Sequence, residues 1–175
     1  MKKISILLLL CVMLFAIPAC QKYEDGPMFS LRSKKARVDG DWRVTKLEFN
    51  NNNVLQDNET LSYLTSCGYI NYNSTSTISN YNWTFNKSGT FNSSYNLSQT
   101  YINTSATYTN CYAVYETTNG SQTENGTWEF TDNKEGLILK YNTAQRIYTI
   151  LALKNNEIHL RYTSGQDVID FHLEQ

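Results

Sequence analysis

The sequence predicts an all-β protein, and three observations predict it: strand alternation, turn chemistry and composition. From residue 81 onward, apolar and polar residues alternate over short segments, which is typical of strands with one buried face. Tyr81, Trp83 and Phe85 share one face, and an Asn-Lys-Ser-Gly turn follows at 86–89. The body is rich in Thr and Tyr, which favour strands, and in Asn, which favours turns.

Short turns between eight or nine such segments force neighbouring strands to pair in antiparallel fashion. A sheet of this length tends to curl, and closure removes its exposed edges. The sequence therefore predicts an up-and-down antiparallel β-barrel of about eight strands. A β-sandwich is the alternative.

The first strand is expected at 41–49, after Gly40. Trp42 and Val44 fall on one face of this strand, and Leu47 and Phe49 are out of phase with them. A change of phase within one strand indicates an extra residue, so we expect a bulge near 45–46.

Residues 50–80 are less regular. Asp57 or Asn58 has the side chain of a helix N-cap, and Leu61 and Leu64 lie at helical spacing before Gly68. We therefore expect a short helix in this stretch.

Each remaining strand is expected to carry its own set of apolar residues. Tyr108, Tyr112 and Val114 should share one face of their strand, with Cys111 on the other. These sets are Phe91, Tyr95 and Leu97; Tyr108, Tyr112 and Val114; Trp128 and Phe130; Leu137, Leu139 and Tyr141; Tyr148, Ile150 and Leu153; Ile158, Leu160 and Tyr162; and Ile169, Phe171 and Leu173.

The N-terminus has the form of an export signal. Lys2 and Lys3 precede an apolar run at 4–17, which is shorter than the roughly 20 residues of a membrane-spanning helix and has the length of a signal-peptide core. Ala19 and Cys20 follow, and a small residue directly before Cys resembles the cleavage site of bacterial lipoproteins. We expect a signal peptide at 1–19 and lipidation of Cys20. The alternatives are an ordinary signal peptide with a nearby Cys and an uncleaved membrane anchor.

A lipidated tether is expected at 20–38, ahead of a barrel domain at 39–175. The lipid would attach the protein to the outer membrane of a Gram-negative bacterium. Glu24 and Asp25 either resemble the signal that exports some lipoproteins to the cell surface or belong to a solvated tether. The tether ends in a basic cluster formed by Arg32, Lys34, Lys35 and Arg37. This cluster either contacts anionic head groups or is a solvated helical turn that caps the domain, and we favour the second interpretation.

Two of the four cysteines are left without a role once Cys11 is assigned to the signal and Cys20 to the lipid. In an oxidising location, Cys67 and Cys111 are expected to form a disulfide. Closing a loop of roughly 45 residues contributes about 4 kcal/mol in the chain-entropy model. A metal site is the alternative, and we disfavour it because neither a CxxC spacing nor a nearby His accompanies these thiols. We expect no bound metal and no cofactor.

The charge and the motifs exclude other classes of function. The formal net charge is −1, and removal of 1–19 takes two lysines and leaves −3, whereas a nucleic-acid partner requires a strongly basic face. The sequence has no phosphate-binding loop, no dinucleotide fingerprint and no HExxH. His159 and His172 alternate with apolar strand residues, so we expect them to face solvent. Asp167 and Asp170 could contribute to a charged site, but a strand face with two acids is usually a solvated face, so we do not expect an enzyme.

Several segments together resemble the lipocalin-like bacterial lipoproteins. Gly40-Asp41-Trp42 is similar to the Gly-x-Trp of lipocalins, and the run from Gly-Thr-Trp-Glu-Phe at 126–130 to Leu160 follows the same family pattern. The stretch 29–37 is a further shared feature, and the resemblance covers most of 27–175. It implies a lipocalin-like barrel in which Arg161 packs over Trp42 as a cation–π pair. The extra strand after Arg161 and the insertion at 50–80 depart from the pattern.

The expected function follows from the aromatic residues. A barrel of eight strands either fills with side chains or holds one small ligand. The candidates for lining a site for a small apolar or aromatic molecule are Trp83, Phe85, Phe91, Tyr95, Tyr108, Tyr112, Trp128 and Tyr148. For any one of them, a place in a plain core is the competing interpretation. The leading expectation is a membrane-anchored, lipocalin-like lipoprotein that binds such a molecule. The alternative is a cell-envelope interaction protein (an adhesin, an inhibitor or a complex subunit) with a filled barrel and no ligand.

Overall fold

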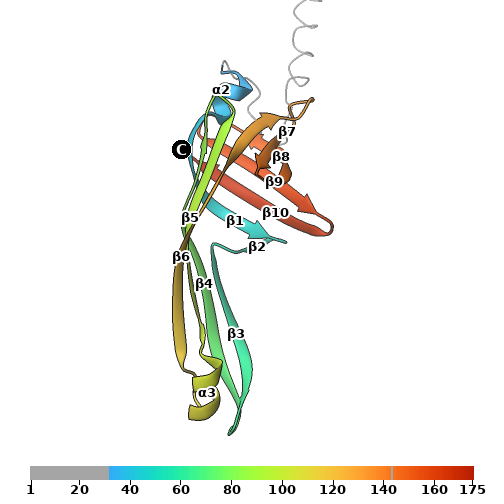
Figure 1. Ribbon diagram of the computed structural model, residues 1–175. Coiled ribbons are helices and arrows are strands. Elements are labelled where there is room, and N and C mark those ends of the chain that lie inside the picture. The colour runs from blue at the N-terminus through green and yellow to red at the C-terminus, as the bar shows by residue number, and fades with distance from the viewer. Residues whose placement is uncertain (1–31, 143) are drawn as a thin grey trace, which may run out of the picture.

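The computed structural model describes residues 32–142 and 144–175, and within them ten strands form one antiparallel sheet (Figure 1). The predicted signal peptide and Cys20 lie outside the described residues. In chain order the elements are α2 (Lys34–Val38), β1 (Gly40–Phe49), β2 (Asn52–Asn53), β3 (Gln56–Thr65), β4 (Gly68–Phe85), β5 (Thr90–Ile102), α3 (Thr104–Asn110), β6 (Tyr115–Phe130), β7 (Gly136–Tyr141), β8 (Gln145–Leu153), β9 (Glu157–Ser164) and β10 (Asp167–Glu174).

Eight of these strands close into a ring. Their order is β1-β10-β9-β8-β7-β6-β5-β4, and β4 pairs back onto β1. The closing pairs set Trp42 opposite Trp83 and Gly40 opposite Phe85. β2 and β3 lie outside the ring. β2 pairs with the last residues of β1, and β3 pairs with the first part of β4. The predicted all-β, up-and-down barrel of eight strands is confirmed.

β1 contains the predicted bulge. Its register against β10 shifts between Val44 and Lys46. Val44 and Leu47 are both buried although they are three residues apart, which strict alternation forbids. The extra residue thus turns the second half of the strand so that Leu47 also faces the interior.

The core of the ring is a cluster of aromatic rings around Trp83. This side chain is 1% exposed, and its ring centroid lies 5.3 Å from that of Phe91 and 5.1 Å from that of Phe171. Phe85 and Tyr148 pack against it at 5.9 and 5.8 Å. Aromatic pairs at these distances add to the free energy of burial, so the cluster fixes the strands around it.

α2 closes one end of the ring. Ser33 caps the helix by accepting a hydrogen bond from the backbone N–H of Ala36 at 3.1 Å. Val38 is fully buried, and its carbonyl accepts a 2.8 Å hydrogen bond from the indole N–H of Trp42. Arg37 is also buried and donates to the carbonyl of Leu153. The helical turn predicted at the end of the tether is therefore part of the folded body.

A long projection leaves the other end of the ring (Figure 1). It consists of β3, the first part of β4, the last part of β5, α3 and the first part of β6, which are residues 56–77 and 96–125; we call it the distal arm. β6 pairs with β7 only from Gly126 onward. Gly126 lies so close to the backbone of Lys140 that a Cβ would overlap it, so this position requires glycine.

Two predictions about the arm are wrong. The helix expected after Asp57 is strand β3, in which Leu61 pairs with Tyr72 and Ser62 with Asn71. Cross-strand bonds such as that from the Ser62 hydroxyl to the Asn71 amide oxygen, at 2.7 Å, favour the extended form.

The strand expected through Tyr108 and Val114 is instead helix α3, followed by a short connection. Asn103 caps α3 by accepting from the N–H of Ala106 at 2.9 Å. Cys111 ends the helix in the left-handed conformation, with φ 61°. Tyr108 is therefore a helix residue and Tyr112 a residue of the connection.

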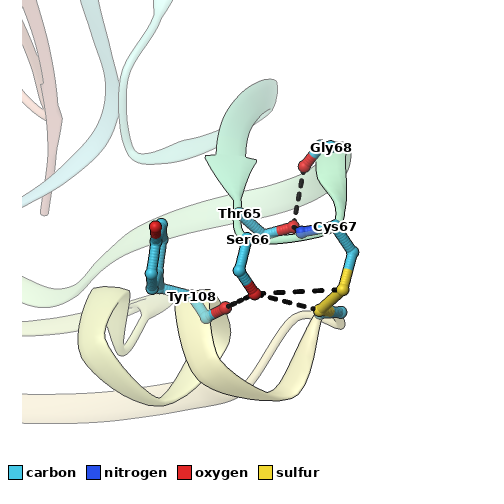
Figure 2. The surroundings of a disulfide bond; sticks show 6 residues. Thr65, Ser66, Cys67, Gly68 and Tyr108 are labelled. Atoms are coloured by element: carbon cyan, nitrogen blue, oxygen red, sulfur yellow. Dashed lines mark hydrogen bonds between the residues drawn. A yellow bond between two sulfur atoms is a disulfide. The ribbon is translucent and has the colours of Figure 1, made fainter.

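The predicted disulfide between Cys67 and Cys111 is confirmed and joins the β3–β4 turn to the end of α3 (Figure 2). The Cα atoms are 5.7 Å apart, within the normal range for a disulfide. Ser66 reinforces the junction, because its hydroxyl donates to the Tyr108 carbonyl at 2.9 Å. The tip of the arm is thus held by a covalent bond where it has few buried apolar side chains.

Truncation of the central ring side chain should destabilise the protein strongly. Trp83→Ala leaves a cavity inside the aromatic cluster, and we expect it to lower the free energy of unfolding by about 3–5 kcal/mol. Ile147→Ala removes a side chain that is 54% exposed on β8 and should cost far less. Urea unfolding of the two variants and the wild type measures the difference, and equal losses would contradict the proposed core.

Loss of the disulfide should act on the arm and leave the ring intact. In the double variant Cys67→Ser/Cys111→Ser, amide hydrogens of α3 and the β3–β4 turn should exchange faster, because the constraint on this loop is lost. Amides of β8 and β9, which lie in the ring away from the arm, should keep their protection. Hydrogen exchange followed by mass spectrometry tests both parts, and faster exchange throughout the ring would show that the arm is not an independent unit.

Candidate functional site

An apolar hollow lies at the end of the ring from which the distal arm projects. It has a volume of about 340 Å³. β1, β4, β5 and β10 and the segment after β2 supply its walls. The lining residues are Leu47, Phe49, Val54, Ile78, Tyr81, Tyr95, Ile169 and Phe171.

Two irregularities of the strands form this hollow. The bulge in β1 turns Leu47 and Phe49 inward, directly opposite Phe171 and Ile169 of β10. The register of β4 against β5 shifts between Ser79 and Asn82. Asn80, inside that shift, has a positive φ of 51°, a conformation that Asn adopts more readily than most residues.

Val54 closes one side of the hollow from outside the ring. Its backbone N–H donates to the Leu47 carbonyl at 2.9 Å, and the N–H of Ile78 donates to the carbonyl of Leu55 at 2.7 Å. The segment after β2 is therefore tied to both β1 and β4. The hollow opens where these two strands have stopped pairing with each other.

The lining is uncharged as well as apolar. None of the eight lining residues is Asp, Glu, Lys, Arg or His. Burial raises the pKa of the Tyr81 phenol well above its ordinary value, so this hydroxyl stays protonated at any physiological pH. Tyr81 packs on Tyr95, with ring centroids 5.0 Å apart, and both rings contribute apolar surface.

Beneath the hollow, aromatic side chains occupy the interior of the barrel. Trp83 contacts both Tyr81 and Phe171 of the lining, with ring centroids 6.1 and 5.1 Å away. Burial also raises the pKa of Tyr148, which packs on Phe171 and Trp83. The aromatic cluster thus forms the floor, and the space above it is limited to the mouth of the barrel.

The eight residues predicted to bind a ligand are not brought together. Five of them are buried in the core below the hollow: Trp83, Phe85, Phe91, Trp128 and Tyr148. Tyr95 lines the hollow. Tyr108 and Tyr112 are 50% and 62% exposed at the tip of the arm, on α3 and directly after it, at the opposite end of the arm from the barrel (Figure 1).

Sequence reasoning missed seven of the lining residues as candidates for the site. Leu47, Phe49 and Tyr81 flank the two bulges, and a change of alternation phase is the signal that would have pointed to them. Val54 lies outside any regular alternation.

The predicted pair of Trp42 and Arg161 is not formed either. Trp42 is buried inside the ring. Arg161 lies between Leu160 and Tyr162, which face the interior, so its side chain is on the outer face of β9. There it makes two hydrogen bonds to the carboxylate of Asp170, at 2.7 and 2.8 Å. The structure therefore places the two side chains on opposite faces of the sheet.

The histidines lie beside this ion pair on the same outer face. His159 and His172 are opposite each other on β9 and β10, with Nε2 and Nδ1 3.1 Å apart. Glu157 lies 2.6 Å from His159 Nε2, and Glu48 lies 3.5 Å from His172 Nε2. Within residues 32–142 and 144–175, no group of three or more His, Cys, Asp or Glu side chains is arranged to hold a metal ion.

None of the described helices is long and apolar enough to cross a membrane. Comparisons of the sequence with protein-family models and with curated proteins found no match.

Proposed function

We propose that this protein is an exported, lipid-anchored, lipocalin-like binding protein that takes one small uncharged apolar or aromatic molecule into the mouth of its barrel. The observation that supports this most is the apolar hollow of about 340 Å³, whose lining has no charged side chain among the described residues. Ligand sites in small barrels are commonly concave, apolar and largely preformed.

The chemistry of the hollow limits the ligand. A charged group would lose its hydration there without gaining a partner of opposite charge, which costs several kcal/mol. Flat apolar molecules are favoured, because the rings of Phe49, Tyr81, Tyr95 and Phe171 offer stacking surfaces. The hydroxyls of the two tyrosines supply the few polar contacts. Binding without chemical conversion is part of the proposal.

Filling the hollow should abolish binding. We expect the folded wild type to bind a neutral fluorescent hydrophobic probe with one-to-one saturation. Val54→Trp places a larger side chain in the hollow and should weaken binding at least about tenfold, because it competes for the same apolar volume. Ile147→Trp, a matched change on the outer face of β8, should leave binding unchanged.

Circular dichroism and thermal unfolding establish that both variants are folded. The proposed binding function is excluded if the folded wild type shows no saturable binding. Equal binding by Val54→Trp and wild type would place the probe elsewhere on the protein.

The anchor has its own test. Cys20→Ser removes the thiol that the lipid would modify, so we expect the variant to leave the membrane fraction or to keep its signal peptide, whereas Cys11→Ser should behave like the wild type. Fractionation and gel mobility measure both. A Cys20→Ser protein that fractionates and migrates like the wild type would show that no lipid is attached there.

The distal arm favours a second candidate function, in which the protein binds another component of the cell envelope. Its tip carries exposed aromatic and aliphatic side chains, namely Leu64, Tyr69, Tyr108 and Tyr112, held together by the disulfide. Tyrosines among Ser, Thr and Asn give rigid contact area with adaptable hydrogen bonding, as in antibody binding loops. If the folded barrel binds no probe, this second function would be favoured over ligand binding.

A further inference from the structure

A second hollow lies at the opposite end of the ring from the ligand site. It has a volume of about 440 Å³ and is lined by Ser33, Lys34, Lys35, Phe130 and Lys134. Lys34 and Lys35 belong to α2, whereas Lys134 belongs to the turn between β6 and β7. Two segments distant in sequence therefore place three ammonium groups around one depression. We call these five residues the basic face.

The fold holds the basic face in place. The Lys34 ammonium donates to the backbone carbonyl of Lys134 at 3.2 Å, which ties α2 to the turn. The Lys35 ammonium lies 6.0 Å from the centre of the Trp128 ring, at the outer limit of a cation–π contact. Phe130 packs edge-on against Trp128 with ring centroids 5.6 Å apart, and it forms the apolar part of the hollow.

The position of the basic face in the chain indicates what it meets. α2 begins two residues after Arg32, and Cys20 precedes Arg32 by twelve residues. Twelve residues of extended chain reach about 40 Å at most. A lipid on Cys20 would therefore hold the α2 end of the protein within about 40 Å of the bilayer, while the tip of the arm lies at the far end of the molecule (Figure 1).

Charged residues are distributed unevenly between the α2 end of the ring and the distal arm. The distal arm contains four acidic residues and no Lys or Arg: Asp57, Glu59, Glu116 and Glu124. The turn that carries Lys134 also carries Asp132 and Glu135, so the attraction depends on the grouping of the three lysines and not on the net charge of that end. An anionic leaflet attracts such a group at short range and repels the acidic arm.

We propose that the basic face rests on the membrane surface and binds the phosphates of anionic phospholipids, so that the distal arm points away from the bilayer. The inference rests on the proposed lipid anchor, which brings this end to the membrane. Lysine stems pack along apolar surface such as Phe130 while their ammonium groups reach the phosphates. The hydroxyl of Ser33 caps α2, so the lysines and Phe130 provide the contact.

The test uses a chain that begins at Gln21 and so lacks the lipid site. Every strand of the closed ring lies between Gly40 and Glu174, so this chain retains the whole ring. It should float with vesicles that contain phosphatidylglycerol, should not float with vesicles of phosphatidylcholine alone, and should be released by high salt. The triple variant Lys34→Gln/Lys35→Gln/Lys134→Gln should lower partitioning about tenfold or more.

A matched control removes three positive charges elsewhere on the barrel. Lys46→Gln/Lys140→Gln/Arg146→Gln changes the net charge equally and should keep most of the binding. An equal loss in both triple variants would reduce the effect to net charge and overturn the proposal. Equal flotation with neutral vesicles would overturn it too.

Failure here is distinguishable from failure of the anchor. If the Gln21 chain does not bind anionic vesicles while Cys20→Ser still releases the full-length protein from membranes, the lipid anchor is supported and the basic face does not bind lipid. If the Gln21 chain binds and Cys20→Ser changes nothing in the cell, the basic face stands without the anchor.

Discussion

One edge of β4 pairs with two different strands, and the rest of the architecture depends on this sharing. Over residues 82–85 the edge pairs with β1 and closes the ring, and over 68–77 it pairs with β3 and builds the distal arm. The positive φ of Asn80 and the shift of register around it separate the two stretches. Without this irregularity, the same edge of β4 would pair with one neighbouring strand along its whole length. The irregularity therefore produces a closed barrel and a projecting sheet from a single strand.

The same sharing explains why the interior is divided into a packed part and an open part. Below the junction, Trp83 and its neighbouring rings pack together inside the ring, where the strands are paired on both sides. At the junction, β1 and β4 diverge, and the chain after β2 bridges them with only two backbone hydrogen bonds, made by Val54 and Ile78. Side chains such as Leu47 and Tyr81 line the gap without filling it. The hollow is thus a consequence of the closure geometry and needs no special residue at its centre.

The sequence predicts the ring well because alternation is a local property. Trp83 and Phe85 alternate with polar residues, and so do Trp128 and Phe130, so the buried face of each strand was readable. Alternation identifies the buried face of a strand but not the position of a residue along the barrel axis. For this reason the sequence predicts Trp128 as a ligand residue, whereas it is part of the core.

The arm was harder to predict because few of its residues are buried. Ser62 and Asn71 stabilise β3 through paired polar side chains, which carry no apolar period. The disulfide was predictable from the expected export and the number of cysteines. The helix at Tyr108 was not, because residues 104–110 carry no apolar residues at helical spacing.

Because β4, β5 and β6 run without a break from the ring into the arm, the arm is also a mechanical element. A force applied at the tip acts along these strands, and the hydrogen bonds between them lie across the direction of pull. Many such bonds then carry the load together, in shear, whereas a flexible loop would extend first. The disulfide at Cys67 and Cys111 prevents the tip from peeling open bond by bond. Tension on the tip of the arm is thus transmitted directly into the strands of the ring.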